Sequence, residues 1–347
     1  MFETLKENMK IITSKSRLRM TSWITLCIII FSFLFNSCKT LENKSNKYSW
    51  VETDTTIALY ALDTIVWKYN FGTEKEKPFF HPINIGSTTL TALSPEDHPW
   101  HLGLWFSWKY IDGVNYWEYD NHSSSKEGPV YGITEIKAVE INKHDDYSCT
   151  IKINISYHEK NLPVILKEQR TIYISSPTEG EYYMDFEIET MSVVDSVELN
   201  RTPLPNEEGG KLWGGYAGLS LRFNTELRNT NFINEDGSSE MKHGESFNWM
   251  YFGLKNRQND RIGTAIFDHP QNLNNPTHWY VTDVPENPYN FNFLQPAVIF
   301  KKPFEIVKDE KLRLSYRVMF YKSGTTHDIV KEDWSDFITI RNRDNNK

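Results

Sequence analysis

Three histidines lie in one short stretch, HPINIGSTTLTALSPEDHPWHLGLWFSW, at His81, His98 and His101. Imidazole takes up and releases protons near neutral pH, so the cluster favours general acid–base chemistry over three separate hydrogen-bonded core histidines. Asp97 directly precedes His98, and Trp100 lies between His98 and His101. Prolines restrict the backbone here, so PEDHPWH is expected to form a stiff loop that aims its side chains. The buried strand predicted from LGLWFSW must hold this loop in place.

A divalent metal is the alternative chemistry for these histidines. The H-x-x-H spacing of His98 and His101, with His81 or His269 as a third ligand, could supply imidazole nitrogens to a metal. Asp97 or Glu118 would be a fourth ligand or would hold one of the ligands in place. A zinc site built from cysteines is excluded, because Cys149 is the one cysteine beyond the N-terminal region. The sequence has no HExxH, Walker or G-x-S-x-G motif. We expect a site that works without a cofactor, with a divalent metal as the alternative.

Two later segments also combine loop-forming residues with polar side chains, NRTPLPNEEGGKLWGGYAGLSLRF and FDHPQNLNNPTHWYV. Their candidate site residues are Arg201, Tyr216, Arg222, His269, Asn274 and Trp279. A tyrosine can donate a proton, and an arginine can bind a carboxylate through two parallel N–H groups. Tryptophan offers a flat apolar face to a ring.

The pattern of the remaining chain is that of β-strands. Short runs of β-branched and aromatic residues alternate with polar residues, as in TIKINI at 150–155, and turn residues separate the runs. The one clear helical pattern is THDIVKEDWSDFITIRN near the C-terminus. We therefore predict an all-β fold, a large antiparallel β-sandwich of jelly-roll or mutarotase-like type with few short helices. No linker divides it, so residues 50–347 are predicted to form a single domain.

The N-terminal region reads as an export signal over residues 1–38. Basic residues precede the apolar run ITLCIIIFSFLF, which is shorter than the about 20 residues of a membrane span. Cys38 follows a small residue, as in a bacterial lipobox, and would carry a lipid anchor. A plain cleaved signal and a permanent anchor helix are the alternatives. Residues 39–49 are predicted to be a solvated tether, and the protein is expected in the periplasm or on the outer membrane as a lipoprotein.

The net charge of −8 disfavours a nucleic-acid partner, because phosphates require a basic surface. Aromatic residues make up 14% of the chain. That content is typical of sugar-binding clefts and also of β-sandwich cores, so composition alone does not distinguish the two.

Four blocks resemble one known family. PEDHPWHLGLWFSW, GGYAGLSLRF, DHPQNLNNPTHWYV and LSYRV occur in this order over roughly 55–325 and resemble the DUF6807 family. The family commonly has a His-His-Arg-Gly run where this chain has Trp100-His101-Leu102-Gly103, so no arginine role transfers to that block. Members are often labelled methane oxygenases. We reject that label, because a membrane monooxygenase subunit needs several apolar spans of about 20 residues and this chain has none after the signal.

The resemblance implies a dehydratase of acidic oligosaccharides of the ulvan type. Such an enzyme removes the C5 proton and the C4 hydroxyl of the non-reducing-end glucuronate or iduronate and leaves a 4,5-unsaturated uronate. The reaction needs a base, an acid and a cation that neutralises the carboxylate. On this chain His98 and His101 would be base or acid, Tyr216 an alternative acid, and Arg222 or Arg201 the carboxylate clamp. The remaining substrate contacts would come from His81, Trp100, His269, Asn274 and Trp279.

Other functions remain open at this point. A polysaccharide lyase begins with the same proton abstraction, and a glycoside hydrolase or an epimerase could use the same residue types. A non-catalytic glycan-binding lipoprotein would use the tryptophans and would not need the imidazoles.

Overall fold

The computed structural model describes residues 47–72, 76–118, 131–284 and 291–344. The predicted signal, Cys38 and most of the predicted tether lie outside the described residues. Within them the chain forms three antiparallel sheets and the helix α2 (His327–Asp344). In spatial order the nine-stranded sheet contains β1 (Tyr48–Glu52), β2 (Thr56–Ala61), β3 (Thr64–Asn70), β4 (Phe79–Ile85), β6 (Leu104–Ser107), β14 (Gly218–Arg222), β19 (Phe291–Ala297) and β18 (His278–Val284), with β5 (Thr88–Thr89) paired to β4.

The other two sheets follow the same antiparallel pattern. The eight-stranded sheet contains β15 (Arg228–Asn234), β16 (Trp249–Lys255), β17 (Arg261–Asp268), β21 (Lys311–Tyr321), β12 (Tyr182–Ser192), β11 (Leu166–Ile174), β10 (Cys149–Glu159) and β9 (Gly132–Lys143). The four-stranded sheet contains β20 (Phe304–Val307), β13 (Ser196–Asn200), β7 (Tyr110–Ile111) and β8 (Val114–Asn115).

The two large sheets pack face to face and enclose the main core. Phe80 of β4 contacts Phe186 of β12 with ring centroids 6.1 Å apart, and Phe223, directly after β14, contacts Phe252 of β16 at 4.5 Å. Alternate residues along each strand point into this core and away from it, as the period of a half-buried strand requires. This arrangement confirms the predicted all-β antiparallel sandwich.

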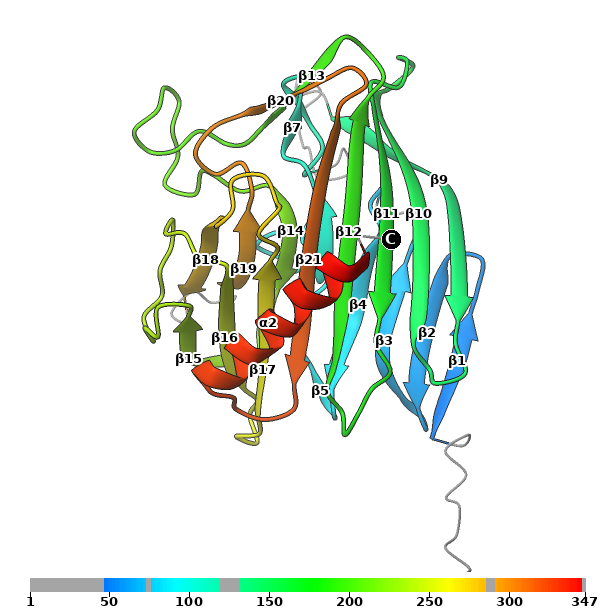
Figure 1. Ribbon diagram of the computed structural model, residues 1–347, viewed down its shortest axis with the longest axis vertical. Helices are drawn as coiled ribbons and strands as arrows, with labels where there is room; N and C mark the ends of the chain where they lie inside the picture. The colour runs from blue at the N-terminus through cyan, green and yellow to red at the C-terminus, as the bar shows by residue number, and fades with distance from the viewer. Residues whose placement is uncertain (1–46, 73–75, 119–130, 285–290, 345–347) are drawn as a thin grey trace, which may run out of the picture. The chain divides into compact units, whose positions relative to one another are not determined.

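The helix α2 forms a third layer on the outer face of the eight-stranded sheet (Figure 1). Thr326 Oγ1 accepts a hydrogen bond from the backbone N–H of Ile329, so a hydroxyl caps the first turn as an N-cap should. The helix packs its apolar side against β16, β17 and β21 through a cluster that includes Trp249, Tyr251, Phe267, Val330 and Phe337. In the described part of the chain, no helix is both long enough and apolar enough to cross a membrane.

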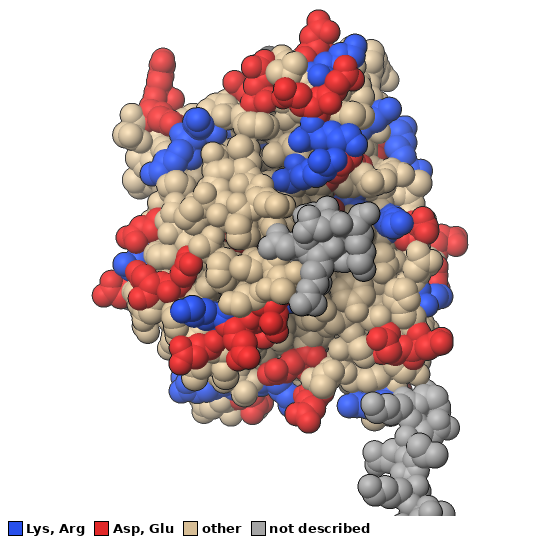
Figure 2. All heavy atoms as spheres, in the orientation of Figure 1, with Lys and Arg blue, Asp and Glu red and all other residues tan. Residues whose placement is uncertain are grey.

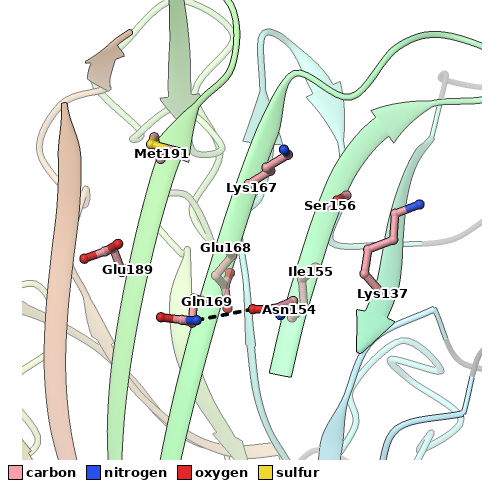
Figure 3. A pocket seen from close by; sticks show the side chains of 9 residues that line it. All are labelled: Lys137, Asn154, Ile155, Ser156, Lys167, Glu168, Gln169, Glu189 and Met191. Carbon is pink, nitrogen blue, oxygen red and sulfur yellow. Dashed lines mark hydrogen bonds between the residues drawn. The ribbon is translucent and has the colours of Figure 1, made fainter. Parts of the chain in front are cut away.

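Beside α2 the outer face of this sheet carries polar side chains on β9 to β12. A shallow groove of about 390 Å³ crosses β9 to β12, and among its lining residues are Lys137, Asn154, Lys167, Gln169 and Glu189 (Figure 3). Acidic and basic side chains are interspersed over the face that carries α2 (Figure 2), as on an ordinary solvated surface.

One buried ion pair lies between the sheets. On β11 the inward positions include Glu168 and Arg170, and both side chains are almost fully buried. Arg170 Nε donates to Glu168 Oε1 at 2.8 Å, and the hydroxyl of Tyr157 donates to Glu168 Oε2 at 2.6 Å. The guanidinium also lies over the ring of Phe106 in the opposite sheet, 5.2 Å from its centroid. Arg170 therefore links the two sheets, because its guanidinium contacts Glu168 in one sheet and Phe106 in the other.

Arg170→Met is expected to lower the free energy of unfolding by about 3–5 kcal/mol, because Glu168 would remain buried without its cation. Urea unfolding followed by tryptophan fluorescence measures the change. Lys167→Met, an exposed position on the same strand, is the matched control and should stay within about 0.5 kcal/mol of the wild type. Replacing both Glu168 and Arg170 by apolar residues should cost less than Arg170→Met alone. Equal losses in the single and double variants would contradict this account.

Candidate functional site

A pocket of about 280 Å³ lies on the face of the nine-stranded sheet that points away from the main core. Phe223 points into that core, so the alternating residue Arg222 of β14 must point to the opposite face, as does its register partner Phe293 of β19. Loops after β5, β8 and β13 contribute to the walls of the pocket. Its lining residues are His98, Trp100, His101, Trp117, Glu118, Trp213, Tyr216, Tyr280, Phe291 and Phe293.

A chain of polar contacts runs from the sheet to the pocket through Arg222, Asp97 and His98. Arg222 Nη2 donates to both carboxylate oxygens of Asp97, at 3.1 and 2.9 Å. Arg222 is fully buried, and its guanidinium lies 4.1 Å from the ring centroid of Phe291. Burial lowers the pKa of Arg222 to about 10 although Asp97 opposes the shift. Burial also raises the pKa of Asp97, but the hydrogen bond from His98 and the charge of Arg222 outweigh it and leave that pKa below its ordinary value.

His98 is the member of this chain that reaches solvent. Its Nδ1 lies 2.9 Å from Asp97 Oδ2, and 35% of its side chain is exposed. Because an ionised carboxylate only accepts hydrogen bonds, the contact assigns the proton to Nδ1 and leaves the lone pair on Nε2. The ring stacks against both Phe291 and His101, with centroids 4.8 and 4.6 Å away. His98 is thus an imidazole of fixed tautomer and orientation, which is what a general base requires.

His101 lies deeper and has a different electrostatic character. Its residue is 4% exposed, and burial, with the charges of His98 and Arg222, holds its pKa well below the ordinary value. The ring is therefore neutral at physiological pH. Its Nδ1 is buried and has no hydrogen-bond partner among the described residues. An unpaired buried nitrogen costs about 1–3 kcal/mol of stability.

Tyr216 and Glu118 also line the pocket, and Lys109 contacts both without lining it. Lys109 is buried and pairs with Glu118, its Nζ lying 2.5 Å from Oε2. The same ammonium lies 5.4 Å from the ring centroid of Tyr216. Burial, with the charge of Glu118, raises the pKa of Tyr216 far above its ordinary value, so its hydroxyl keeps its proton.

The pair of Lys109 and Glu118 was not predicted from the sequence, although a local signal exists. The dipeptide Asp112-Gly113 is a strong hairpin turn, and it joins β7 to β8. A hairpin brings the residues before and after it to the same end, so Lys109 and Glu118 meet there. Trp213 was not predicted either, and its neighbours Gly214 and Gly215 marked only a loop.

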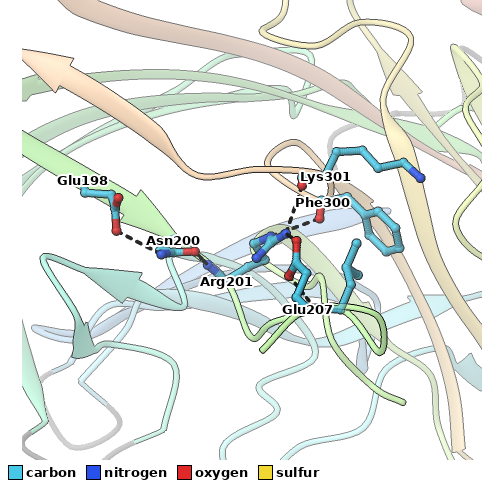
Figure 4. Close-up of polar contacts among 7 residues, drawn as sticks. Glu198, Asn200, Arg201, Glu207, Phe300 and Lys301 are labelled. Carbon is cyan, nitrogen blue, oxygen red and sulfur yellow. Dashed lines mark hydrogen bonds and ion pairs between the residues drawn. The ribbon is translucent and has the colours of Figure 1, made fainter. Parts of the chain in front are cut away.

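Arg201 does not line the pocket. Its Nη2 pairs with Glu207 Oε1 at 2.6 Å and also donates to the carbonyl of Lys301, while Nε donates to the carbonyl of Phe300 (Figure 4). Glu207 in turn accepts from the backbone N–H of Leu204. Arg201 therefore fastens the loop after β13 to the segment after β19. Its guanidinium already donates to Glu207 and to two backbone carbonyls, which makes it a poor candidate for binding a substrate carboxylate.

His81 and His269 also lie outside the pocket lining. His81 Nδ1 contacts Thr91 Oγ1 at 2.9 Å, and burial lowers the pKa of His81 to about 4. His269 follows β17 in the other large sheet, where its ring contacts Phe337 of α2 at 5.5 Å. Neither histidine joins His98 and His101. Among the described residues, no three His, Cys, Asp or Glu side chains gather in a way that could hold a metal ion.

Asn274 and Trp279 have structural contacts. Asn274 adopts a left-handed backbone with φ of 59°, and its Nδ2 donates to the carbonyl of Val298 at 2.8 Å. Trp279 is fully buried, and its Nε1 donates to the carbonyl of Phe247. Tyr280, one residue further along β18, is the one that lines the pocket. Of the ten predicted site residues, the structure brings His98, Trp100, His101 and Tyr216 together in the pocket lining and places Arg222 behind it.

Comparison with known proteins gives one family match and distant structural likenesses. Residues 56–335 match the family described as "Family of unknown function (DUF6807)". No curated protein matches the chain. A protein from Klebsiella pneumoniae subsp. pneumoniae MGH 78578, provisionally assigned as an aldose 1-epimerase, superposes with a TM-score of 0.40 at 8% identity, over 84% of this chain and 87% of that one. A polysaccharide lyase superposes with a TM-score of 0.30 at 10% identity, over 80% of this chain and 33% of the lyase.

Both TM-scores are below 0.5, so neither likeness bears on the chemistry. The family match is of another kind, because it extends from β2 to the middle of α2 and includes each residue of the pocket. This protein belongs to the DUF6807 family.

Proposed function

We propose that this protein is a carbohydrate-active lyase that removes water from the non-reducing-end uronate of acidic, ulvan-type oligosaccharides. The observation that carries the proposal is the imidazole of His98, oriented by Asp97, at an aromatic-walled pocket. Flat aromatic side chains suit the apolar faces of a pyranose ring, and the half-buried Trp100 and Phe291 provide such faces beside the imidazole. Export and a lipid anchor at Cys38 remain part of the same proposal.

His98 would act as the base. Its Nε2 takes the C5 proton, the electron pair of that C–H bond forms the C4–C5 double bond, and the C4–O bond breaks. Tyr216 would protonate the departing hydroxyl, which leaves as water. The raised pKa of Tyr216 suits this role, because the phenol is protonated before the reaction and hydroxide is the stronger base. The phenolate then recovers a proton from solvent, and the imidazolium returns one.

Neutralisation of the substrate carboxylate is the third requirement, because the C5 proton is barely acidic otherwise. Arg222 and Arg201, the two candidates from the sequence, are both engaged with carboxylates of the protein. Lys109 is paired as well, but its partner Glu118 lines the pocket, whereas Asp97 and Glu207 do not. We therefore assign the role to Lys109, with a substrate carboxylate taking the place of Glu118. His101 would complete the pocket as a neutral hydrogen-bonding group.

His98→Ala is expected to lower kcat/KM by about 100-fold or more, since general acid–base catalysis is worth roughly 10²–10⁴-fold. The ultraviolet absorbance of the conjugated unsaturated uronate measures the rate on glucuronate- and iduronate-ended oligosaccharides. Mass spectrometry should find products lighter by one water and equal in chain length. Shorter products would mean a chain-cleaving lyase. His144→Ala, at an exposed histidine on the β9–β10 turn, is the control. A loss of less than about tenfold in His98→Ala would remove the base assignment.

Asp97→Asn is expected to lower kcat by about 100-fold or more and to change KM only a few-fold, because the amide no longer holds the proton of His98 on Nδ1 through a charge-assisted hydrogen bond. The wild-type carboxylate stays ionised below its ordinary range, as its lowered pKa requires. The absorbance assay gives both constants, and circular dichroism checks that the variant is folded. A fall in kcat that only follows a loss of folded protein would contradict a positioning role for Asp97.

Treatment with EDTA is expected to leave the activity unchanged, because the acid, the base and the cation of the proposed mechanism are all side chains. The assay is the same absorbance measurement after dialysis against the chelator. Inactivation that one divalent ion reverses would instead assign carboxylate neutralisation to a metal.

A further inference from the structure

We propose that Trp213 forms a second sugar-binding subsite at the mouth of the pocket. The terminal residue of an oligosaccharide would occupy the pocket, and the next residue would stack on the indole. The subsite rests on the proposed function only in taking an oligosaccharide as the ligand.

Trp213 is exceptional among the tryptophans. It lines the pocket together with His98 and Tyr216, yet 58% of the residue is exposed. In the described part of the chain the other tryptophans are buried or half-buried. Full burial of a large apolar side chain is worth about 1.5–3 kcal/mol, so an indole kept in solvent forgoes much of this stabilisation. A binding surface explains the position.

A well-defined turn presents the indole. The N–H of Gly214 donates to the carbonyl of Lys211 at 2.9 Å, which makes Leu212 and Trp213 the two central residues of the turn. The N–H of Lys211 donates to the carbonyl of Pro203 at 3.0 Å, and so fixes the turn to the incoming chain. Its tip is therefore held by backbone hydrogen bonds while both central side chains face solvent.

Two further features make the base of this turn rigid. Arg201 and Glu207 clamp the preceding loop to the carbonyls of Phe300 and Lys301 (Figure 4). At Gly214 a Cβ atom would lie only 2.1 Å from the carbonyl oxygen of Pro203, so the chain can pack this closely only with glycine. A rigid aromatic loses little conformational entropy when a ligand stacks on it.

The size of the pocket indicates which part of an oligosaccharide would contact Trp213. Its volume of about 280 Å³ lies below the about 300–1,000 Å³ typical of pockets for drug-sized ligands. It suits one sugar residue, and a longer chain must continue past the mouth. The exposed indole is the aromatic surface at that position, so the protein should bind oligosaccharides more tightly than single uronates.

The test compares ligands of two lengths on the full protein. Isothermal titration calorimetry measures binding of a glucuronate-ended tetrasaccharide and of methyl glucuronide to the wild type, Trp213→Ala, Trp213→Phe and Leu212→Ala. We expect Trp213→Ala to weaken tetrasaccharide binding roughly 5- to 20-fold and methyl glucuronide binding by less than about twofold. Trp213→Phe should restore most of the affinity. Leu212→Ala, at the neighbouring position of the same turn, should behave as the wild type.

The outcomes separate the subsite from the proposed reaction. Unchanged tetrasaccharide binding by Trp213→Ala would overturn the subsite, even where unsaturated product still forms. The expected loss of binding, in a protein that forms no unsaturated product, would support the subsite and overturn the elimination. Equal loss for both ligands would also overturn the subsite, because it would place Trp213 at the terminal residue.

Discussion

The site depends on a guanidinium that has no access to water. Arg222 is fully buried, so its charge must be neutralised within the protein, and Asp97 is the carboxylate that does so. The backbone of Arg222 also holds the segment 92–103, which contains Asp97, His98 and His101. Its carbonyl accepts from the N–H of Ala92, and its N–H donates to the carbonyl of Gly103. Arg222 therefore fixes both ends of this segment by its backbone and the middle by its side chain. Together these three contacts determine the position of His98.

A buried ion pair of this kind is weak evidence for stability. Desolvation of two charges offsets much of their attraction, and apolar residues of similar size often stabilise a protein as well. The pair of Arg222 and Asp97 does something that apolar packing cannot do. Asp97 Oδ2 contacts both the guanidinium of Arg222 and Nδ1 of His98, and the charge of Arg222 helps to keep Asp97 ionised, so the tautomer of the imidazole is fixed. The pair of Arg170 and Glu168 lies in the main core. Among the described residues, its hydrogen bonds include none to a residue that lines the pocket, so we assign it to the packing of the two sheets.

The sequence predicted the sandwich and the loop of His98 and His101 for the same reason, since both follow from local pattern. Alternation defines which side chains of a strand share a face, and the prolines of PEDHPWH restrict a short segment. The predictions that failed, such as Trp279 and His269, depend on strand register and on contacts between segments far apart in the sequence. Trp279 and Tyr280 are adjacent, and only pairing of β18 with β19 decides which of them faces the pocket. His269 was grouped with His98 because each lies in a segment that was predicted to be a polar loop. The topology instead places His269 directly after β17, which belongs to the other large sheet.

For the proposed acidic substrate, the electrostatics of the pocket make stacking the main source of affinity. The charges beside the pocket include two pairs, Arg222 with Asp97 and Lys109 with Glu118, while His101 is neutral and the buried Lys77 also helps to lower its pKa. Paired charges produce little field at a distance, so these two pairs would attract an acidic sugar from solution less than unpaired cations would. The proposed exchange at Lys109 replaces one carboxylate by another and would therefore yield little net binding free energy. Aromatic contact would then supply most of the affinity, and the charge pairs would decide where the carboxylate lies once the ring is bound.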